Sequence, residues 1–504
     1  MAENLHLLMS GFGIVLQPLN FIWLTVGVIL GTMIGVMPGI GPISGVALLI
    51  PLTYSMNPVT ALMTMSGLYY GAMYGGSTTS ILLNVPGENS SVVTCLDGFQ
   101  LAKQGRAGSA LGIAAIGSFV AGTIGVILLQ FLAPPLGHWA LAFGPSEYFS
   151  LMILGLMSAT TLNEGSAAKG LMAVGMGLAL GTIGIDLQTG TTRFTFGRLD
   201  LLDGVDFLVL ALGLFSISEV IWEATHKDDM VERIKLKSPW PTWKDLKDSS
   251  GAILRGSSLG FFMGVLPGVG ASTASFVSYA VEKQISKDPD KFGKGAIEGV
   301  AAPESANSGA SEGALVSLLS LGLPGSGTTA IMLGALMMFG IQPGPLLIPK
   351  HPEIFWGIVA SMYIGNVMLL VLNLPLVPLF AKILDIPKQL LLPIIVVLSS
   401  IGVYALSNSR TDLELMLLFG LCGILMRVYQ IPTPPMILAL VLGPMVEQSM
   451  RQALTISRGN WGTFVTHPIS ATLLVFALAF LAFPFLRRAI AQSRSRARAG
   501  RTAA

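Results

Sequence analysis

The sequence predicts an all-α polytopic membrane protein with two inverted structural repeats. Each repeat is expected to hold a re-entrant hairpin and a transmembrane helix interrupted by Gly and Pro. Three observations predict this fold. Only 11% of the 504 residues are charged while 52% are hydrophobic, whereas soluble domains carry roughly 25% charged residues. Apolar segments recur along the chain, and two Pro-Gly patterns occur in the same order in both halves.

The composition also excludes several classes of protein. So much apolar surface does not fit one soluble core, which argues against a cytosolic enzyme, a disordered scaffold and a nucleic-acid binder. The chain has no phosphate-binding G-x-x-x-x-G-K-[ST] motif and no H-E-x-x-H motif. Its two cysteines match no metal spacing. We therefore expect no ATP hydrolysis, no transition-metal site and no cofactor.

Apolar segments predict the crossings, because about 20 helical residues span the hydrocarbon core. We expect about 11 crossings, at 59–84, 108–133, 147–162, 167–185, 204–222, 297–330, 354–381, 389–406, 412–430, 434–447 and 468–486. Two pairs of shorter arms, 20–36 with 43–54 and 252–266 with 271–281, flank Pro38–Gly41 and Pro267–Gly270. Each pair predicts a re-entrant hairpin, with one kinked spanning helix as the alternative.

The repeat is readable from the residues themselves. GTMIGVMPGIG (31–41) aligns with GFFMGVLPGVG (260–270), which places Pro38 opposite Pro267. LLNVPGENSS (82–91) aligns with SLGLPGSGTT (320–329), which places Pro86 opposite Pro324. An odd number of predicted crossings separates the two hairpins, so the second copy is inverted. Inverted halves with matching interrupted helices are typical of secondary transporters that bind substrate at the midplane.

Charge predicts the division of the chain and its orientation. Basic residues concentrate in 223–255, in 283–294 and in the C-terminal tail, and basic loops remain in the cytoplasm. The N-terminus is therefore expected outside and the C-terminus inside. We expect a first repeat (1–222), a cytoplasmic linker (223–250), a second repeat (251–450), a terminal transmembrane helix region (451–486) and an Arg-rich cytoplasmic tail (487–504).

Polar residues gather at the interruptions, where they predict a substrate site. A helix that ends inside the membrane exposes backbone groups that need a polar cavity or protein partners, and its N-terminus attracts anions. The substrate-binding candidates are Gly39, Gly41, Pro86, Gly87, Asn89, Ser90, Ser91, Gly268, Gly270, Ser272, Thr273, Gly325, Ser326, Thr328 and Thr329. The alternatives are glycines that only pack helices and hydroxyls that bond their own backbone.

An acidic segment predicts the ion-coupling site. EGVAAPESANSGASEGA (298–314) carries three glutamates, and an acid at membrane depth is costly unless it meets a cation or a polar cavity. The coupling ion is expected to be Na⁺ or a proton. The ion-coupling candidates are Ser77, Thr78, Asn84, Glu304, Asn307 and Ser308. The alternative for Glu304 is a solvated helix start at the membrane edge.

At these motifs the sequence resembles a known family. GVMPGIGPISGVALLIPLTYSMNP (35–58), GLYYGAMYGGSTTSILLNVPGENSS (67–91) and LGLPGSGTTAIMLGAL (321–336) are similar to the large membrane subunit of the tripartite tricarboxylate transporter family. The resemblance implies a subunit of the cell inner membrane that works with a small membrane subunit and a periplasmic solute-binding protein. It implies uptake of citrate-like or other organic carboxylates through the lipid bilayer, driven by an ion gradient.

The resemblance also assigns residues. It implies functional roles for the hairpin tips Pro38–Gly41 and Pro267–Gly270, for the interruptions Pro86–Ser91 and Pro324–Thr329, and for the acid–amide pair of Glu304 and Asn307. Ser308 departs from the pattern, since a second Asn is expected there. Two other functions stay open, a passive channel and a docking scaffold for a periplasmic binding protein.

Overall fold

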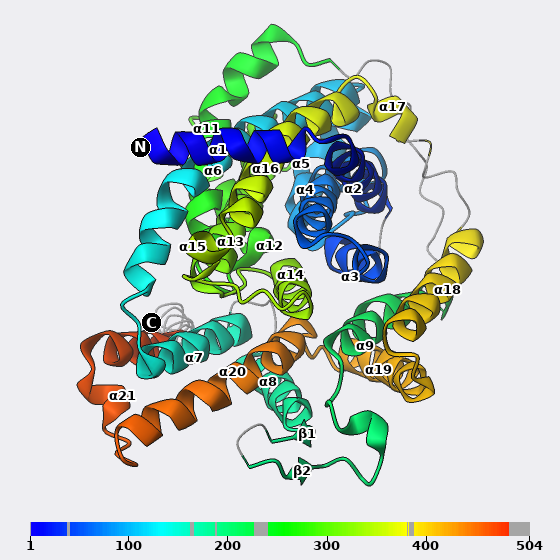
Figure 1. Cartoon of the computed structure of the whole chain (residues 1–504). Helices are drawn as coiled ribbons and strands as arrows, with labels where there is room; N and C mark the ends of the chain where they lie inside the picture. Colours follow the sequence, from blue (N-terminus) through cyan, green and yellow to red (C-terminus); the bar gives the residue numbers. More distant parts are fainter. Residues whose placement is uncertain are drawn as a thin grey trace, which may run out of the picture. The chain divides into compact units, whose positions relative to one another are not determined.

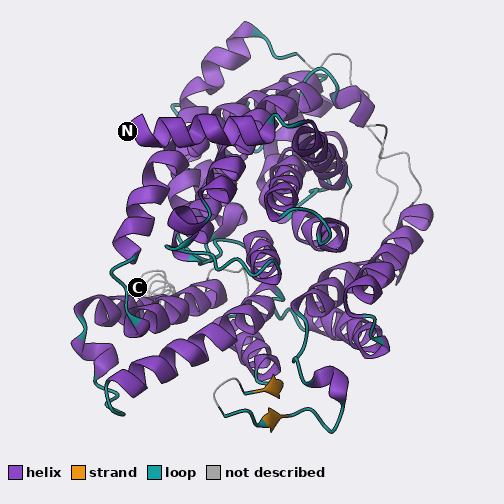
Figure 2. Ribbon diagram, viewed as in Figure 1, coloured by secondary structure: helices purple, strands orange, loops and turns teal. Residues whose placement is uncertain are grey.

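The computed structural model describes residues 2–37, 41–161, 166–186, 189–225, 240–380, 382 and 388–482. These residues are helical apart from connecting turns and one antiparallel pair of two-residue strands, β1 (Gly184–Ile185) and β2 (Thr192–Arg193) (Figure 2). Much of the predicted linker (226–239), the hairpin-tip residues 38–40 and the Arg-rich tail lie outside the described residues.

The helices follow the predicted segments closely (Figure 1). Their bounds are α1 Ala2–Val15, α2 Pro18–Val36, α3 Gly41–Thr53, α4 Pro58–Leu83, α5 Val92–Lys103, α6 Ala107–Ala140, α7 Pro145–Thr161, α8 Ala167–Gly181, α9 Phe207–Ala211, α10 Ser218–Thr225, α11 Trp243–Val265, α12 Gly270–Ile285, α13 Glu298–Leu321, α14 Gly327–Met338, α15 Leu347–Lys350, α16 Pro352–Asn373, α17 Val377–Phe380, α18 Lys388–Ser407, α19 Arg410–Val428, α20 Pro434–Ile456 and α21 Thr463–Thr466. A further apolar helix covers Pro468–Ala482. Short 3₁₀ turns lie at η1 Asn89–Ser91, η2 Leu199–Leu201 and η4 Pro289–Lys291, and a π-helical segment, η3 Leu212–Ile217, joins α9 to α10.

Four of the described helices are long and apolar enough to cross a membrane: Pro18–Val36, Ala107–Ala140, Phe207–Thr225 and Pro352–Asn373. The all-α architecture agrees with the sequence prediction. The predicted crossing 297–330 consists of two helices, α13 and α14, separated at residues 322–326. Helices α1 and α5 are not among the predicted crossings. α1 is only 14 residues long, and α5 carries the charged residues Asp97 and Lys103.

The chain divides into two compact units. The first contains Met1–Leu141 and Asp206–Leu425, and the second contains Ala142–Val205 and Met426–Ala504. Each unit takes residues from both predicted repeats. In the second unit, α20 packs against α7 and α8. There Arg451 pairs with Asp186 (2.9 Å) and Glu447 (2.5 Å). The polar network described below lies entirely in the first unit.

Glycines let two pairs of helices in the first unit pack at backbone distance. α2 packs on α4, and α11 packs on α13. A Cβ at the α2 positions would lie 2.2–2.3 Å from a carbonyl oxygen of α4, and a Cβ at the α11 positions 2.2–2.4 Å from a carbonyl oxygen of α13. The contacts are Gly27–Thr64, Gly31–Leu68 and Gly35–Ala72, and Gly256–Ala302, Gly260–Ala306 and Gly264–Ala310. Only small residues permit this approach. The two sequence alignments place the α2 glycines opposite the α11 glycines and the α4 contact residues opposite those of α13. The three contacts of α11 with α13 therefore repeat the three contacts of α2 with α4.

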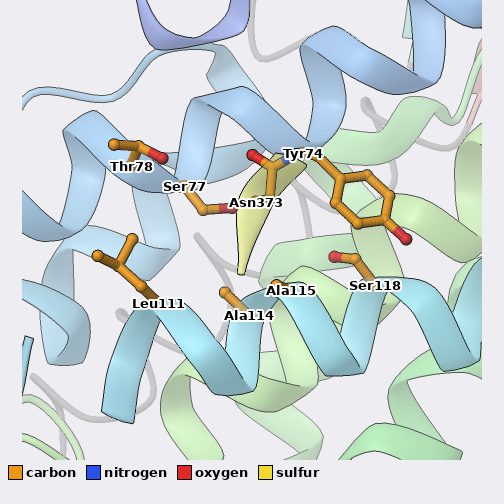
Figure 3. Close-up of a pocket in the computed structure, with 8 residues that line it drawn as sticks. All are labelled: Tyr74, Ser77, Thr78, Leu111, Ala114, Ala115, Ser118 and Asn373. Carbon is orange, nitrogen blue, oxygen red and sulfur yellow. The ribbon is translucent and has the colours of Figure 1, made fainter. Parts of the chain in front are cut away.

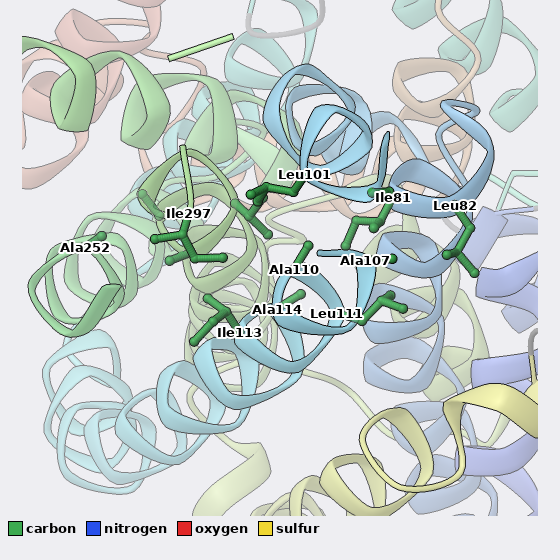
Figure 4. Packing of buried hydrophobic residues seen from close by; sticks show 14 of the residues in the cluster. Ile81, Leu82, Leu101, Ala107, Ala110, Leu111, Ile113, Ala114, Ala252 and Ile297 are labelled. Atoms are coloured by element: carbon green, nitrogen blue, oxygen red, sulfur yellow. The ribbon is translucent and has the colours of Figure 1, made fainter. Parts of the chain in front are cut away.

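An apolar cluster joins elements from both halves of the chain (Figure 4). Ile81 of α4, Leu101 of α5 and Ala110 of α6 belong to it, together with Ala252 of α11 and Ile297. Alanines on α6 keep the helices close, so this cluster sets the spacing of the polar residues on α4, α5 and α13.

Two buried acids form hydrogen bonds at the N-terminal ends of α13 and α11. Asp97 of α5 accepts hydrogen bonds from the N–H groups of Gly293, Gly295 and Ala296 (2.7–2.8 Å), just before α13 begins. Asp245 forms a capping box with Thr242 at the start of α11. Burial opposes its ionisation, but the hydrogen bonds from Thr242 and the charge of Arg106 hold the pKa of Asp245 below its usual range.

Candidate functional site

The two predicted interruptions have the same backbone geometry. After α4, Asn84 ends the helix in the left-handed region (φ 57°), and Glu88 is extended (φ −149°, ψ 167°) before η1 and α5. After α13, Gly322 ends the helix (φ 72°), and Ser326 is extended (φ −150°, ψ 168°) before α14. The Pro-Gly pairs therefore produce matching breaks.

Each break ends in a capping box that starts the next helix. The side chain of Glu88 accepts from the backbone of Ser91, and the Ser91 hydroxyl accepts from the N–H of Glu88 (3.3 Å). Likewise the Ser326 hydroxyl accepts from the N–H of Thr329 (3.3 Å), and the Thr329 hydroxyl accepts from the N–H of Ser326 (2.8 Å). The caps satisfy donors that a helix start leaves unpaired. Part of the polar clustering at these sites thus has a local structural cause.

Gly87 and Gly325 hold the breaks against the glycine-packed helices. A Cβ at Gly87 would lie 2.3 Å from the carbonyl oxygen of Gly35 on α2. A Cβ at Gly325 would lie 2.8 Å from the carbonyl oxygen of Gly264 on α11. A side chain at either position would push the break away from its neighbour.

The capping residue of each break contacts the long helix of the other half. Asn307 of α13 donates from Nδ2 to Oε1 of Glu88 (2.8 Å). The hydroxyl of Tyr69 on α4 lies 3.3 Å from that of Ser326. Tyr69 and Asn307 are themselves equivalent positions of the two repeats, because the alignment of the breaks places one opposite the other. The helices that follow the hairpin tips also pack against the break of the other half: α12 packs against η1, and α3 packs against α14.

Glu304 sits beside this network. Its side chain is 1% exposed, so the interpretation of a solvated helix start is wrong. Ser77 of α4 donates to its Oε2 (2.6 Å), and Thr94 of α5 donates to its Oε1. Among the ion pairs of the described residues, none involves Glu88 or Glu304. Two acids are therefore buried close together with hydroxyl and amide donors but without a basic partner.

A small cavity adjoins Ser77 (Figure 3). It lies between α4, α6 and α16. Its volume is about 10 Å³, about enough for one water molecule. Its lining residues are Tyr74, Ser77, Thr78, Leu111, Ala114, Ala115, Ser118 and Asn373. The Oδ1 atom of Asn373 is buried and has no hydrogen-bond partner within the described chain. Hydroxyl and amide oxygens around a space of this size suit a water molecule or a small hard cation.

The other predicted residues differ in burial and in position. Ser90 is buried and donates to Oε1 of Glu88 (2.5 Å), and Thr328 and Ser308 are also buried. In contrast, Asn84 and Asn89 are exposed. At the hairpin tips, Gly41, Gly268 and Gly270 have positive φ values (62°, 78° and 68°) that shape the turns. Ser272 and Thr273 are half-buried on α12, and Gly39 lies outside the described residues.

Three contributors are missing from the sequence-based site prediction, namely Thr94, Tyr69 and Asn373. The alignment of the two breaks could have identified Tyr69, because it places this residue opposite Asn307. Thr94 belongs to the polar residues that follow the first Pro-Gly pair, but nothing in the sequence pairs it with Glu304. No pattern points to Asn373. The roles of both residues depend on how α5 and α16 pack. Across the described residues, no three His, Cys, Asp or Glu side chains are grouped as metal ligands.

Comparison with known proteins shows the family to which the chain belongs. The chain is 46% identical over 487 residues to an uncharacterized 52.8 kDa protein in the TAR-I ttuC' 3'region of Agrobacterium vitis, covering 96% of this chain and 97% of that one. It is 49% identical over 220 residues to an uncharacterized protein in the TAR-II ttuC' 3'region of the same organism, covering 44% of this chain and 90% of that one. No solved structure matches. The family model of the tripartite tricarboxylate transporter TctA family matches residues 21–438, and the chain belongs to this family.

Proposed function

We propose that this chain is the solute-translocating subunit of a secondary transporter that takes up tricarboxylates or related organic carboxylates by alternating access. Family membership makes the chain a transport component and not an enzyme. The crossed contacts of Glu88 with Asn307 and of Tyr69 with Ser326 carry the proposal. They tie the two breaks to the opposite long helices, as expected of one substrate site between two inverted repeats.

The chemistry of the breaks suits an anionic substrate. Helix starts offer N–H groups and a positive dipole end, which bind carboxylates. α4, α13 and α14 contain no Lys or Arg. The substrate charge is therefore neutralised by N–H groups, by hydroxyls such as those of Ser326 and Thr328, and by a cation bound with the substrate. A site of this kind releases its substrate when the cation leaves.

We assign the coupling ion to the region of Glu304, with Na⁺ or a proton as the ion. Ser77 joins the carboxylate of Glu304 to the small cavity, where Thr78 and Asn373 add further oxygen ligands. A buried carboxylate with neutral donors and no basic partner is stabilised by a cation. Because Glu304 also lies near the Glu88 cap, the bound ion and the substrate site influence one another.

The partners and the membrane topology follow the sequence analysis. A small membrane subunit and a periplasmic solute-binding protein complete the transporter in the cell inner membrane. The N-terminus is periplasmic and the C-terminus cytoplasmic, in keeping with the basic 223–250 linker and the Arg-rich tail. Residues 1–222 and 251–450 form the inverted repeats, with hairpins that re-enter the membrane. The repeated glycine contacts support this division.

Reconstitution tests the proposal. The chain is placed in proteoliposomes with its small subunit and its solute-binding protein, and citrate and other di- and tricarboxylates are offered under imposed Na⁺ or pH gradients. A carrier gives saturable uptake and accelerated exchange of labelled substrate (counterflow). Conduction that does not saturate would indicate a passive channel, and binding without solute accumulation would indicate a docking scaffold.

A matched pair of variants tests the ion site. Glu304→Gln removes the charge, and we expect it to reduce ion-driven uptake at least tenfold. Glu298→Gln changes an acid of the same helix that pairs with Lys291 (2.5 Å) away from the site, and we expect it to retain uptake within about twofold, because partly exposed ion pairs contribute little. Equal uptake by the two variants would contradict the assignment of Glu304.

A further inference from the structure

A second buried acid lies on the same helix and takes no part in the network of Glu88 and Glu304. Glu312 follows Glu304 by eight residues on α13, about two helical turns. Its side chain is 4% exposed. Its Oε2 atom has no hydrogen-bond partner in the part of the chain that the structure describes. Each carboxylate oxygen of Glu304 accepts from a hydroxyl group, whereas Oε2 of Glu312 has no such donor.

The site around Glu312 is tight and apolar at its base. A Cβ at Gly125 of α6 would lie 2.6 Å from the Cβ and 2.7 Å from the Cγ of Glu312. The same Cβ would lie 3.7 Å from the ring of Phe261 on α11. Glycine at position 125 therefore makes the space that the glutamate occupies.

Four tyrosine hydroxyls lie close enough to Glu312 to interact electrostatically with its carboxylate. They are Tyr69, Tyr70 and Tyr74 of α4 and Tyr363 of α16. Each hydroxyl already has another partner. Their respective partners are Ser326, Ser361, Asn366 and Gln130. Each phenol is therefore near enough to interact with the charge of Glu312, while its hydroxyl is bonded to another residue.

The charged residues on the other elements that pack around α13 lie near the start of this helix or at the surface. Asp97 of α5 binds Ala296, 16 residues before Glu312, or roughly 24 Å along a helix. Arg255 of α11 pairs with Glu282 of α12 (2.7 Å). These residues lie near the level of Ala302, where Gly256 contacts α13. Glu88 caps η1 beside Asn307, and Lys350 of α15 is exposed.

This environment makes the charged form of Glu312 costly. Burying an ionised carboxylate without a charged partner or hydrogen-bond donors costs several kcal/mol, so such a group takes up a proton or meets a cation. We therefore expect the group to be neutral in this conformation. A conformation in which water reaches it would allow it to ionise.

We propose that Glu312 is the site that carries a proton through the transport cycle. A hydronium ion on one side gives its proton to the carboxylate, which forms the O–H bond of the carboxyl group and leaves water. When the site opens to the other side, that O–H bond breaks and water there accepts the proton. One proton moves, and nothing is oxidised or reduced. The inference rests on the proposed transport function and deepens it, because it separates a proton site at Glu312 from the ion site at Glu304.

Luminal pH measured during uptake tests the proposal. Proteoliposomes containing the complete transporter enclose a pH-sensitive dye, and the carboxylate used is the one that supports counterflow, with citrate tested first. Wild-type transporter should acidify the lumen as substrate enters. Glu312→Gln keeps the shape of a neutral acid, so counterflow should stay within about twofold of wild type and lose its pH dependence. Acidification and uptake driven by a pH gradient should fall at least tenfold.

The control variant is Glu298→Gln, on the same helix but outside the site, which should behave as wild type in all three assays. Acidification by Glu312→Gln at the wild-type rate would overturn the proposal. So would a wild-type transporter that accumulates substrate by net uptake while the luminal pH stays constant, a result that does not depend on the folding of any variant. Absence of counterflow in the wild type would instead refute the proposed transport function.

Discussion

Gly87 is the position where a single methyl group should disturb the substrate site most. The Cβ of an alanine there would lie 2.3 Å from the carbonyl oxygen of Gly35 and 2.7 Å from the Cα of Gly76. Ordinary contacts begin at 3.4 Å, so the segments would have to separate by about 1 Å. Both atoms belong to the backbone, and no flexible side chain can yield. Overpacking of this kind costs about 1–3 kcal/mol.

That cost should appear in transport because Gly87 precedes the cap Glu88. Every 1.4 kcal/mol is about tenfold in an equilibrium constant, so we expect Gly87→Ala to reduce kcat/KM for uptake roughly 5- to 150-fold. Gly325→Ala should cost less, since its Cβ would lie 2.7 Å from the Cβ of Ala314 and 2.8 Å from the carbonyl oxygen of Gly264.

Counterflow kinetics in proteoliposomes and melting temperatures in detergent measure the two effects separately. Gly13→Ala on α1 is the matched control, because no atom lies within 4 Å of the added Cβ. It should transport as wild type and gain up to about 1 kcal/mol of helix stability. Wild-type kinetics for Gly87→Ala, or a larger defect in Gly325→Ala, would refute the steric reasoning.

Three further predictions concern the network and its supports. Tyr69→Phe and Ser326→Ala should each cost about 0.5–1.5 kcal/mol of stability or substrate affinity and be strongly non-additive in a double-mutant cycle, whereas additive losses would show that their contact contributes nothing. Hydrogen bonds from Thr242 lower the pKa of Asp245. The ionised side chain therefore stabilises the fold at pH values above its unfolded pKa of about 3.9, and this stabilisation is lost as the pH falls through the folded pKa. Asp245→Asn should therefore lower the melting temperature at pH 7, and a deficit that grows in acid would contradict this reasoning. Asp97→Ala removes the acceptor of one buried N–H, that of Ala296, and of the less buried N–H groups of Gly295 and Gly293. It should cost about 1–3 kcal/mol, measured as chemical unfolding of the purified protein, and unchanged stability would contradict this structural role.

The helix breaks were predictable because their chemistry is local. Proline has no N–H to donate, and glycine tolerates conformations that end a helix. α4 accordingly ends at Leu83 and α13 at Leu321, next to the Pro-Gly pairs. The repetition of the break was also readable from the sequence. The predicted crossing 297–330 runs across the second break, because apolar residues continue on both sides and hydropathy does not register a change of helix.

The pairing across the site was not predictable from the sequence alone. The alignment of the breaks places Tyr69 opposite Asn307. An aromatic residue in an apolar helix usually indicates a packed core, however, so the sequence alone does not show that the Tyr69 hydroxyl reaches Ser326. Thr94 meets Glu304 only because α5 folds back beside α13, at a sequence separation of 210 residues. Hydrophobic periodicity identifies the buried face of a helix, but not its partner. Long-range polar contacts therefore require the tertiary structure.

The three buried acids differ mainly in the donors that surround them, and this difference orders their roles. Glu88 accepts hydrogen bonds from Ser90 and Asn307 and also caps the helix start at η1. Its carboxylate is therefore held in place at the first break. Glu304 accepts hydrogen bonds from two hydroxyl groups, which offset part of the cost of burying its charge beside a bound cation. Glu312 lacks comparable donors, and burial then favours the neutral acid. A single helix, α13, carries both Glu304 and Glu312, so a movement of α13 that changes access to water would act on the cation and the proton together.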